Sequence, residues 1–292
     1  MTTPEDRYRY VPVTRPNAAR WPNGAGLAVY IALGIESYVF GKGMTEDIIP
    51  GVPHPDFTNA SWRDYGNRVA GFRILDRCRE LGIPLSVLLN TDVYDAAPDL
   101  IGACRDMGCA MVAHGRTNSD TLAGMDEAAE RRYLESVRDR MLAAGDTPAG
   151  WSSPWLAQNA HTADLLRETG YRYVLDLHLD DRPVWLRTRS GPLLHIPYGI
   201  ELNDSSTVIG RQASPHDFAT MIVDEFDELL AASAIQPLVM SIVIHSFISG
   251  QPFRLRPLTA ALEHIRQHAD RVWLTTSDAI CARVLENPAL AV

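Results

Sequence analysis

The sequence lacks any uninterrupted apolar run near the roughly 20 residues that a membrane helix requires, so we expect no membrane partner. Its basic residues form no cluster interleaved with aromatics, and its net charge of −9 comes from dispersed carboxylates, which argues against nucleic acid as a partner. Residues 1–16 contain no apolar segment of the kind that a secretory signal carries. The four cysteines have no CxxC spacing, which is typical of reduced thiols in a cytoplasmic protein, the location we expect.

The chain does have enough apolar material for one large core. It contains 292 residues, of which 46% are hydrophobic, and one α/β barrel normally takes about 250 residues. Residues 1–25 are rich in proline, arginine and asparagine, and we expect them to form an N-terminal extension packed on the barrel. Residues 26–292 are expected to form a single barrel domain.

Strand and helix patterns alternate along this domain. A continuous apolar run predicts a buried strand over 26–35, and apolar residues at three- and four-residue intervals predict a helix over 63–81 that ends at Gly82. The proline-rich segment 36–61 is expected to be an ordered loop. Further strands are predicted over 84–90, 109–115, 171–177, 238–245 and 271–276, and short extended pieces over 183–188 and 193–200. Further helices are predicted over 97–108, 125–144, 162–170, 215–232, 258–268 and from 277 onward. This alternation favours an α/β fold and, within it, a distorted (β/α) barrel over an open sheet.

Ionisable or amide side chains follow several of these strands. In barrels of this kind, the C-terminal ends of the strands carry the chemistry, and the opposite ends mostly carry stability. The residues in question are Glu36, His114, Asp176, Asn203, Asp204 and His245. We therefore expect these side chains to meet at one rim of the barrel.

Glu36, His114 and His245 are the leading candidates for chemistry. Burial of Glu36 beside Tyr38 and Phe40 would disfavour its charged form, as suits a general base, although a salt-bridged rim carboxylate is the simpler alternative. Each histidine ends an apolar strand and is either a proton-transfer group or a packed structural residue.

The same residues could hold a metal. Glu36, His114 and Asn118 would supply the ligands of a single divalent ion such as zinc, but Asn118 is a weak neutral ligand, so we do not favour a cofactor. The stretch "GWSSPW" has no GxSxG elbow, which argues against a serine nucleophile at Ser152 or Ser153.

Aromatic side chains could form the walls of a pocket. Trp155, Trp185 and Tyr198 fit such a role, although core packing explains them almost as well. Asp176 begins a carboxylate-rich stretch that is either part of the site or a solvated turn.

An ordered set of motifs extends from about Trp21 to Ala279. It comprises "IALGIES", "DYGNRVAGFRILDRCRELGIP", "AHGRTNSD", "PAGWSSPW", "YRYVLD", "IPYGIELND" and "VIHSFISGQPFR". In this order and spacing, the chain resembles the polysaccharide deacetylase (NodB-homology) superfamily. Within it, the chain is similar to the branch of metal-independent bacterial allantoinases and cyclic-imide hydrolases. The resemblance implies a distorted barrel of the NodB-homology type.

The chain departs from the metal-dependent esterases of that superfamily. Those enzymes bind a divalent metal through one Asp and two His, and the resemblance aligns Gly34 with their base Asp and Glu36 with their metal Asp. His114 matches the first metal histidine, Asn118 stands in place of the second, and His245 matches the late catalytic histidine. The motif Ser152-Ser153-Pro154 lacks the expected arginine. The allantoinase-like pattern is kept at Tyr65-Gly66, Pro197-Tyr198, Asn203-Asp204 and Gly250-Gln251-Pro252.

The resemblance implies a hydrolase of a C–N bond in a small amide, ureide or cyclic imide. Glu36 would orient or deprotonate water, and His114 and His245 would transfer protons or stabilise the intermediate. Asn118 and Asn203 would bind carbonyl or amide groups, and Arg116 would hold an anionic group of the substrate. The alternatives are a metal-dependent carbohydrate N- or O-deacetylase and a catalytically silent barrel that binds a small molecule. We expect a small-molecule substrate as the partner and assembly into a homo-oligomer.

Overall fold

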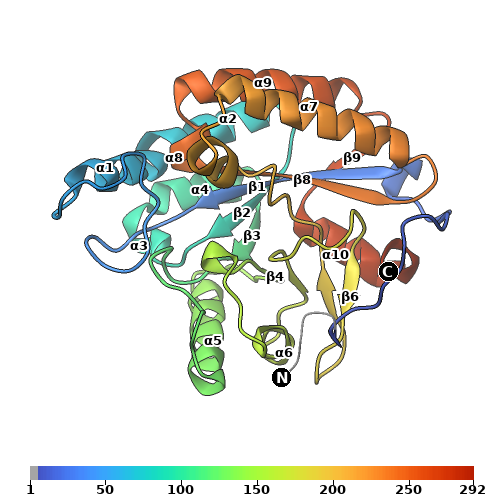
Figure 1. The fold of residues 1–292 in the computed structure, drawn as a ribbon, viewed down its shortest axis with the longest axis horizontal. Coiled ribbons are helices and arrows are strands. Elements are labelled where there is room, and N and C mark those ends of the chain that lie inside the picture. Colours follow the sequence, from blue (N-terminus) through green and yellow to red (C-terminus); the bar gives the residue numbers. More distant parts are fainter. Residues whose placement is uncertain (1–5) are drawn as a thin grey trace.

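The computed structural model describes residues 6–292, which form a curled, mostly parallel sheet covered by helices (Figure 1). The strands are β1 (Leu27–Ile35), β2 (Leu85–Leu89), β3 (Ala110–Ala113), β4 (Gly150–Trp151), β5 (Tyr173–Val174), β6 (Val184–Leu186), β7 (Leu193–His195), β8 (Leu238–His245) and β9 (Val272–Thr275). The α-helices are α1 (Phe57–Tyr65), α2 (Gly71–Leu81), α3 (Val93–Ala96), α4 (Pro98–Asp106), α5 (Glu127–Ala143), α6 (Thr162–Glu168), α7 (Pro215–Ala232), α8 (Ser246–Ser249), α9 (Pro252–Gln267) and α10 (Ser277–Glu286).

The sheet is a distorted barrel whose strand order is β6-β7-β5-β4-β3-β2-β1-β8, with β9 beside β1. Its pairings are parallel except for that of β6 with β7. Coil segments connect β8 to the far end of the sheet. The backbone carbonyl of Asp181, just before β6, accepts a hydrogen bond from the N–H of Val239, and Asn203 forms a β-bridge with Val243. The predicted α/β fold and distorted barrel are therefore confirmed.

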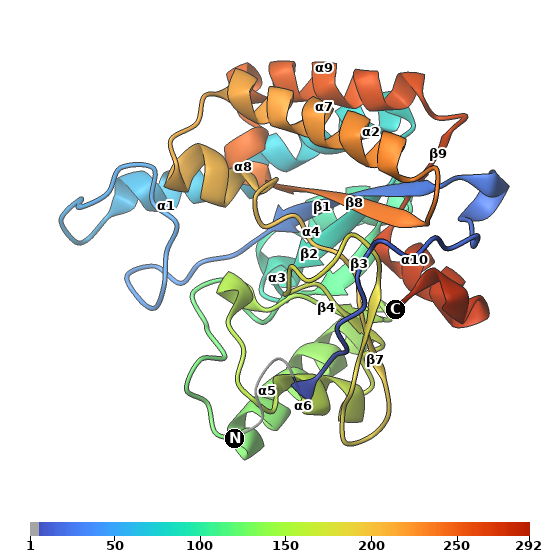
Figure 2. The same cartoon turned by 45° about the vertical axis from the view of Figure 1, so that its right-hand side comes forward.

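The two faces of β1 separate the core into two clusters. All nine residues of this strand are buried. Leu27, Val29 and Ile31 face the helix-covered outside, whereas Ala28 and Tyr30 belong to the cluster inside the curl. This alternation follows from the period of two along a strand. Outside the sheet, α7 and α9 pack side by side with α2 next to them, and α5 and α6 lie on the opposite side of the molecule (Figures 1 and 2).

Several predicted boundaries differ from those in the structure. The helix predicted over 63–81 begins already at Phe57, where Asp56 accepts the backbone N–H of Asn59, and it passes through a π-helical turn, η3 (Gly66–Ala70). The prediction of a loop as far as residue 61 was therefore wrong over its last turn. Gly82 ends the helix with a left-handed φ of 64°, as predicted. The strand predicted over 171–177 shortens to Tyr173–Val174.

The segment before β1 lies against the domain. Arg7 pairs with Asp164 at 2.7 Å, and the backbone N–H of Asn17 donates to the carbonyl of Ile235. Trp21 is almost fully buried and donates its indole N–H to the carbonyl of Leu238. The four cysteines are free thiols.

Within residues 6–292, no helix combines the length and the apolar character that crossing a bilayer demands.

Candidate active site

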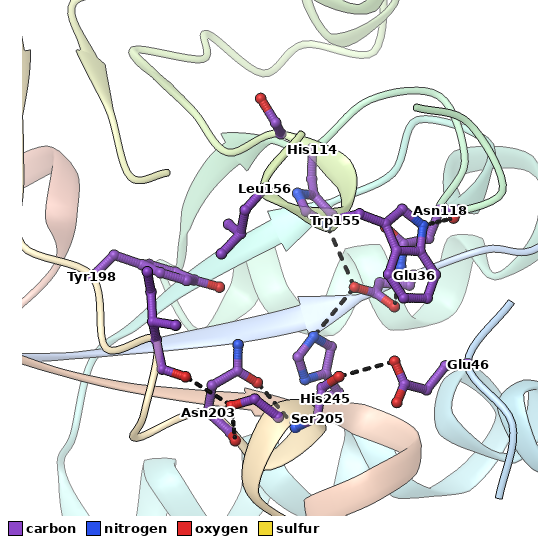
Figure 3. A pocket seen from close by; sticks show the side chains of 13 residues that line it. Glu36, Glu46, His114, Asn118, Trp155, Leu156, Tyr198, Asn203, Ser205 and His245 are labelled. Atoms are coloured by element: carbon purple, nitrogen blue, oxygen red, sulfur yellow. Dashed lines mark hydrogen bonds and ion pairs between the residues drawn. The ribbon is translucent and has the colours of Figure 1, made fainter. Parts of the chain in front are cut away.

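Glu36, His114 and His245 converge at one rim of the barrel (Figure 3). Glu36 directly follows β1, His114 directly follows β3, and His245 is the last residue of β8. The Nε2 atoms of both histidines lie 3.4 Å from the same carboxylate oxygen, Oε1 of Glu36. All three side chains are buried. Parallel strands that end at one rim bring these distant parts of the sequence together, as their positions after strands predicted.

The outer nitrogen of each imidazole, Nδ1, faces away from Glu36 and is held in place by a hydrogen-bond partner. Nδ1 of His114 lies 2.8 Å from the carbonyl oxygen of Ser152, which can only accept, so Nδ1 carries a hydrogen and Nε2 faces Glu36. Nδ1 of His245 lies 2.6 Å from a carboxylate oxygen of Asp204. Each ring therefore turns Nε2 into the site.

Asp204 is fully buried and fixed by several donors. It accepts the backbone N–H of His245 at 2.9 Å and the hydroxyl of Ser249 at 2.5 Å, in addition to Nδ1 of His245. A buried carboxylate behind an imidazole fixes the orientation of the ring and stabilises its protonated form. Asp204 thus acts on the site through His245.

Opposite charges set the protonation of Glu36 and His245. Burial alone would raise the pKa of Glu36, but the charge of His245 and the contacts of both histidines with its carboxylate outweigh it and lower that pKa. The expectation that burial would disfavour the charged form of Glu36 was therefore wrong. Burial would lower the pKa of His245, but Glu36 and Asp204 raise it well above its usual value of 6.5. At neutral pH, a carboxylate therefore faces an imidazolium.

Tyr38 and Asn118 complete the surroundings of Glu36. The hydroxyl of Tyr38 donates to Oε2 of Glu36 at 2.6 Å. The amide nitrogen of Asn118 donates to the same oxygen at 3.1 Å and to the oxygen of Tyr38 at 2.9 Å. The Tyr38 hydroxyl donates its one hydrogen to Glu36, so its oxygen can only accept a hydrogen bond from Asn118. The Asn118 amide must therefore turn its N–H₂ group toward Tyr38 and Glu36. The carbonyl oxygen of Asn118 is buried without a partner among the described residues.

These groups line a pocket of about 170 Å³. Its lining residues are Glu36, Glu46, His114, Asn118, Ser153, Trp155, Leu156, Tyr198, Ile200, Asn203, Ser205, Ser206 and His245. Trp155 and Leu156 form one wall in consecutive left-handed conformations, with φ of 60° and 53°. Such strained backbone is typical of ligand sites. The indole N–H of Trp155 donates to the carbonyl of Asn118, which ties this wall to the Glu36 network.

Comparisons with known proteins find several chains that are similar to this one. The chain is similar to the solved structure of PuuE allantoinase, at 26% identity and a TM-score of 0.83, over 94% of this chain and 95% of that one. It is similar to a structure described as a polysaccharide deacetylase from Pseudomonas aeruginosa PAO1, at 25% identity and a TM-score of 0.80, over 94% and 95% of the two chains. A protein of Schizosaccharomyces pombe, described as a polysaccharide deacetylase, is 23% identical over 89% of this chain and 90% of its own length.

The chain is thus similar both to an allantoinase and to proteins described as polysaccharide deacetylases. No family model matches the chain.

The set of metal ligands that the resemblance to metal-dependent esterases implies has no equivalent here. Asn118 presents its N–H₂ group to Glu36 rather than a lone pair, and Oε2 of Glu36 accepts hydrogen bonds from both Asn118 and Tyr38. Within residues 6–292, no cluster of His, Cys, Asp and Glu side chains has the arrangement of a metal site. The donors as arranged do not fit the expected three-ligand metal.

The position of the His245 ring explains why residue 34 has no side chain. This residue pairs with His245 across β1 and β8. A Cβ atom on Gly34 would lie 2.6 Å from Cδ2 of His245, closer than any real contact. The His245 ring therefore occupies the space that a side chain at position 34 would need.

The structure sorts the other predicted site residues into two groups. Trp155, Tyr198, Asn118 and Asn203 line the pocket. Asp176 lies behind the lining, where it accepts hydrogen bonds from the backbone N–H and hydroxyl of Ser153 and from Gln158, and burial raises its pKa.

Three predictions about the pocket were wrong. Arg116 is half exposed outside it, because Asp92 and Asp120 hold its guanidinium at the surface. Trp185 does not line it, because β6 is an antiparallel edge strand and this ring packs among the apolar side chains inside the curl. Phe40 is 47% exposed and packs on Phe57, so it does not form part of the pocket around Glu36.

Sequence reasoning missed Glu46 and the role of Asp204. Glu46 lies in the middle of the proline-rich loop, away from the end of any strand, so no sequence pattern indicated a role for it. Asp204 stood next to the predicted Asn203, but only the fold brings it behind His245.

We expect Gly34→Ala to displace the His245 ring and to cost about 1–3 kcal/mol of stability through overpacking. Imidazole NMR should show loss of the hydrogen bond from His245 Nδ1 to Asp204, and thermal unfolding should show the destabilisation. Gly102→Ala is the matched control, since a Cβ there meets nothing within 4 Å. An unchanged His245 signal would contradict the steric explanation.

We expect Asp204→Asn to lower the pKa of His245, because one of the two carboxylates that raise it is removed. The stability from the charged His245 is fully present below pH 6.5 and is lost as pH rises through the raised pKa. An NMR titration of the imidazole should therefore move to lower pH in the variant. Ser249→Ala, which keeps the Asp204 charge, is the control, and equal titrations in all three proteins would refute the assignment.

Proposed function

We propose that this protein hydrolyses a C–N bond in a small ureide, amide or cyclic imide without a bound metal. The observation that carries the proposal is the Glu36 carboxylate, buried between two imidazoles whose outer nitrogens are fixed. The Glu36 carboxylate can accept a proton and the adjacent His245 imidazolium can donate one, so a base and an acid lie side by side. The likeness to PuuE allantoinase supports this reaction class.

In this mechanism, Glu36 is the base and His245 is the acid. Oε1 of Glu36 takes a proton from water as the water oxygen bonds to the substrate carbonyl carbon. Nε2 of His114 faces the same carboxylate oxygen and orients that water. The C–N bond then breaks as His245 Nε2–H protonates the leaving nitrogen. The proton on Glu36 returns to His245 across the 3.4 Å between them, which restores the site.

Asn203 is suited to bind the reacting carbonyl oxygen. Its own side-chain oxygen accepts the backbone N–H of Ser205, so its amide N–H₂ group remains for the pocket (Figure 3). A donor placed at a developing oxyanion supplies a few kcal/mol of transition-state stabilisation.

A carbohydrate deacetylase is the second candidate, because relatives carry that description. A peptidoglycan deacetylase of Helicobacter pylori is also similar, at 25% identity over 63% of this chain and 73% of that protein. Against it stand the mismatched metal ligands and the small pocket, which the Trp155 and Leu156 wall bounds. The pocket volume of about 170 Å³ suits a small ring better than a polymer.

A substrate panel tests the proposal. Hydantoin, allantoin and succinimide should be hydrolysed, and N-acetylated chitin oligomers should not. Glu36→Gln and His245→Ala should each lower kcat by roughly 100- to 10,000-fold while the folded structure is kept. Glu201→Gln, at an exposed glutamate paired with Arg211, is the control. Ligand binding without turnover across the panel would favour a silent barrel, and turnover of the oligomers alone would favour the deacetylase.

Removal of metals provides an independent test. Because Asn118 offers a donor rather than a lone pair, we expect dialysis against a chelator to leave kcat/KM unchanged. Elemental analysis should find well under one divalent ion per chain. Loss of activity that one equivalent of zinc restores would overturn the metal-free mechanism.

A further inference from the structure

Glu46 is a second carboxylate in the pocket, and the mechanism does not use it. Its side chain faces the same cavity as Glu36, His245 and Asn203 (Figure 3). The Ser205 hydroxyl donates to its Oε2 atom at 2.9 Å and is the one hydrogen-bond donor to this carboxylate within residues 6–292. The other oxygen remains free to accept hydrogen bonds from a ligand.

The loop that carries Glu46 is anchored on both sides. Before it, Met44 N–H donates to the carbonyl of Ser119, and Gly43, with φ of 68°, approaches the same carbonyl so closely that a Cβ would lie 2.2 Å from it. After it, the Asn59 amide holds both the N–H and the carbonyl of Ile49, at 3.0 and 2.9 Å. The Glu46 carboxylate is therefore held at the pocket rather than free to swing into solvent.

No salt bridge neutralises Glu46 in the part of the chain that the structure describes. The nearby Arg63 donates instead to the backbone carbonyl of Glu46 at 2.8 Å and to the Asp47 carboxylate at 2.7 Å. Arg116, which we expected to bind an anionic group of the substrate, lies outside the pocket. The pocket thus holds two carboxylates, and its cationic His245 lies between Glu36 and Asp204.

We propose that Glu46 determines specificity by accepting paired N–H groups from a ureido or amidino arm of the substrate. A carboxylate with a free oxygen and no cationic partner binds such paired donors well and repels anions. Because Glu36 and Glu46 line one small pocket, the arm and the scissile bond belong to the same small molecule. This inference rests on the proposed function, since it names the substrate class of that site.

A comparison of hydantoin with allantoin isolates the contribution of the arm, because allantoin is the hydantoin ring with a ureido arm. Glu46→Gln should lower kcat/KM for allantoin by about 10- to 100-fold, mostly through KM, and should change that for hydantoin less than about twofold. Glu201→Gln, the same change at an exposed site, should alter neither value. An equal loss on both substrates, or no loss on allantoin, would overturn the role of Glu46.

A binding measurement distinguishes this inference from the proposed function. If the wild type hydrolyses neither compound, the proposed function fails, and methylguanidinium then tests Glu46 by itself. NMR titration should show pocket resonances shifting with this cation in the wild type and in Glu201→Gln but not in Glu46→Gln. Equal binding by wild type and Glu46→Gln, with both proteins folded by circular dichroism, would refute the inference.

Discussion

The burial of the Glu36 carboxylate is the constraint on which the rest of the site depends. Removing an ionised carboxylate from water costs several kcal/mol unless partners compensate it. Here two imidazoles, the Tyr38 hydroxyl and the Asn118 amide surround its two oxygens. Their combined effect keeps the carboxylate charged although almost no water reaches it. A charged carboxylate in such an environment is ready to bind and activate a water molecule.

Each of these partners is in turn held by something farther from the pocket. The Ser152 carbonyl orients His114, and Asp204 orients His245. Asp204 is itself held by Ser249 and by the backbone of His245. Support of this kind matters because a proton-transfer group must keep its geometry to within a fraction of an ångström.

The position of the His245 ring also helps to explain how this chain differs from the metal-dependent esterases that its motifs resemble. The ring packs against Gly34, two residues before Glu36. It therefore fills the space that a carboxylate side chain at position 34 of β1 would need. Asn118 presents hydrogens to Glu36, so the second metal ligand is replaced by a donor that stabilises the carboxylate directly. The two substitutions are consistent with each other, because both serve a site whose central anion is balanced by hydrogen bonds and by His245.

The sequence by itself determined the parts of this protein that depend on local patterns. Apolar runs predicted β1 and β8, helical periodicity predicted α7, and the rule that parallel strands end at one rim brought together Glu36, His114 and His245. Only the tertiary structure decided the rest. It placed Glu46 at the pocket through contacts with Ser119, Arg63 and Asn59, and it held Arg116 at the surface. The path of a loop is set by contacts with distant segments and has no period of its own, so its side chains find their places only when the whole chain has folded.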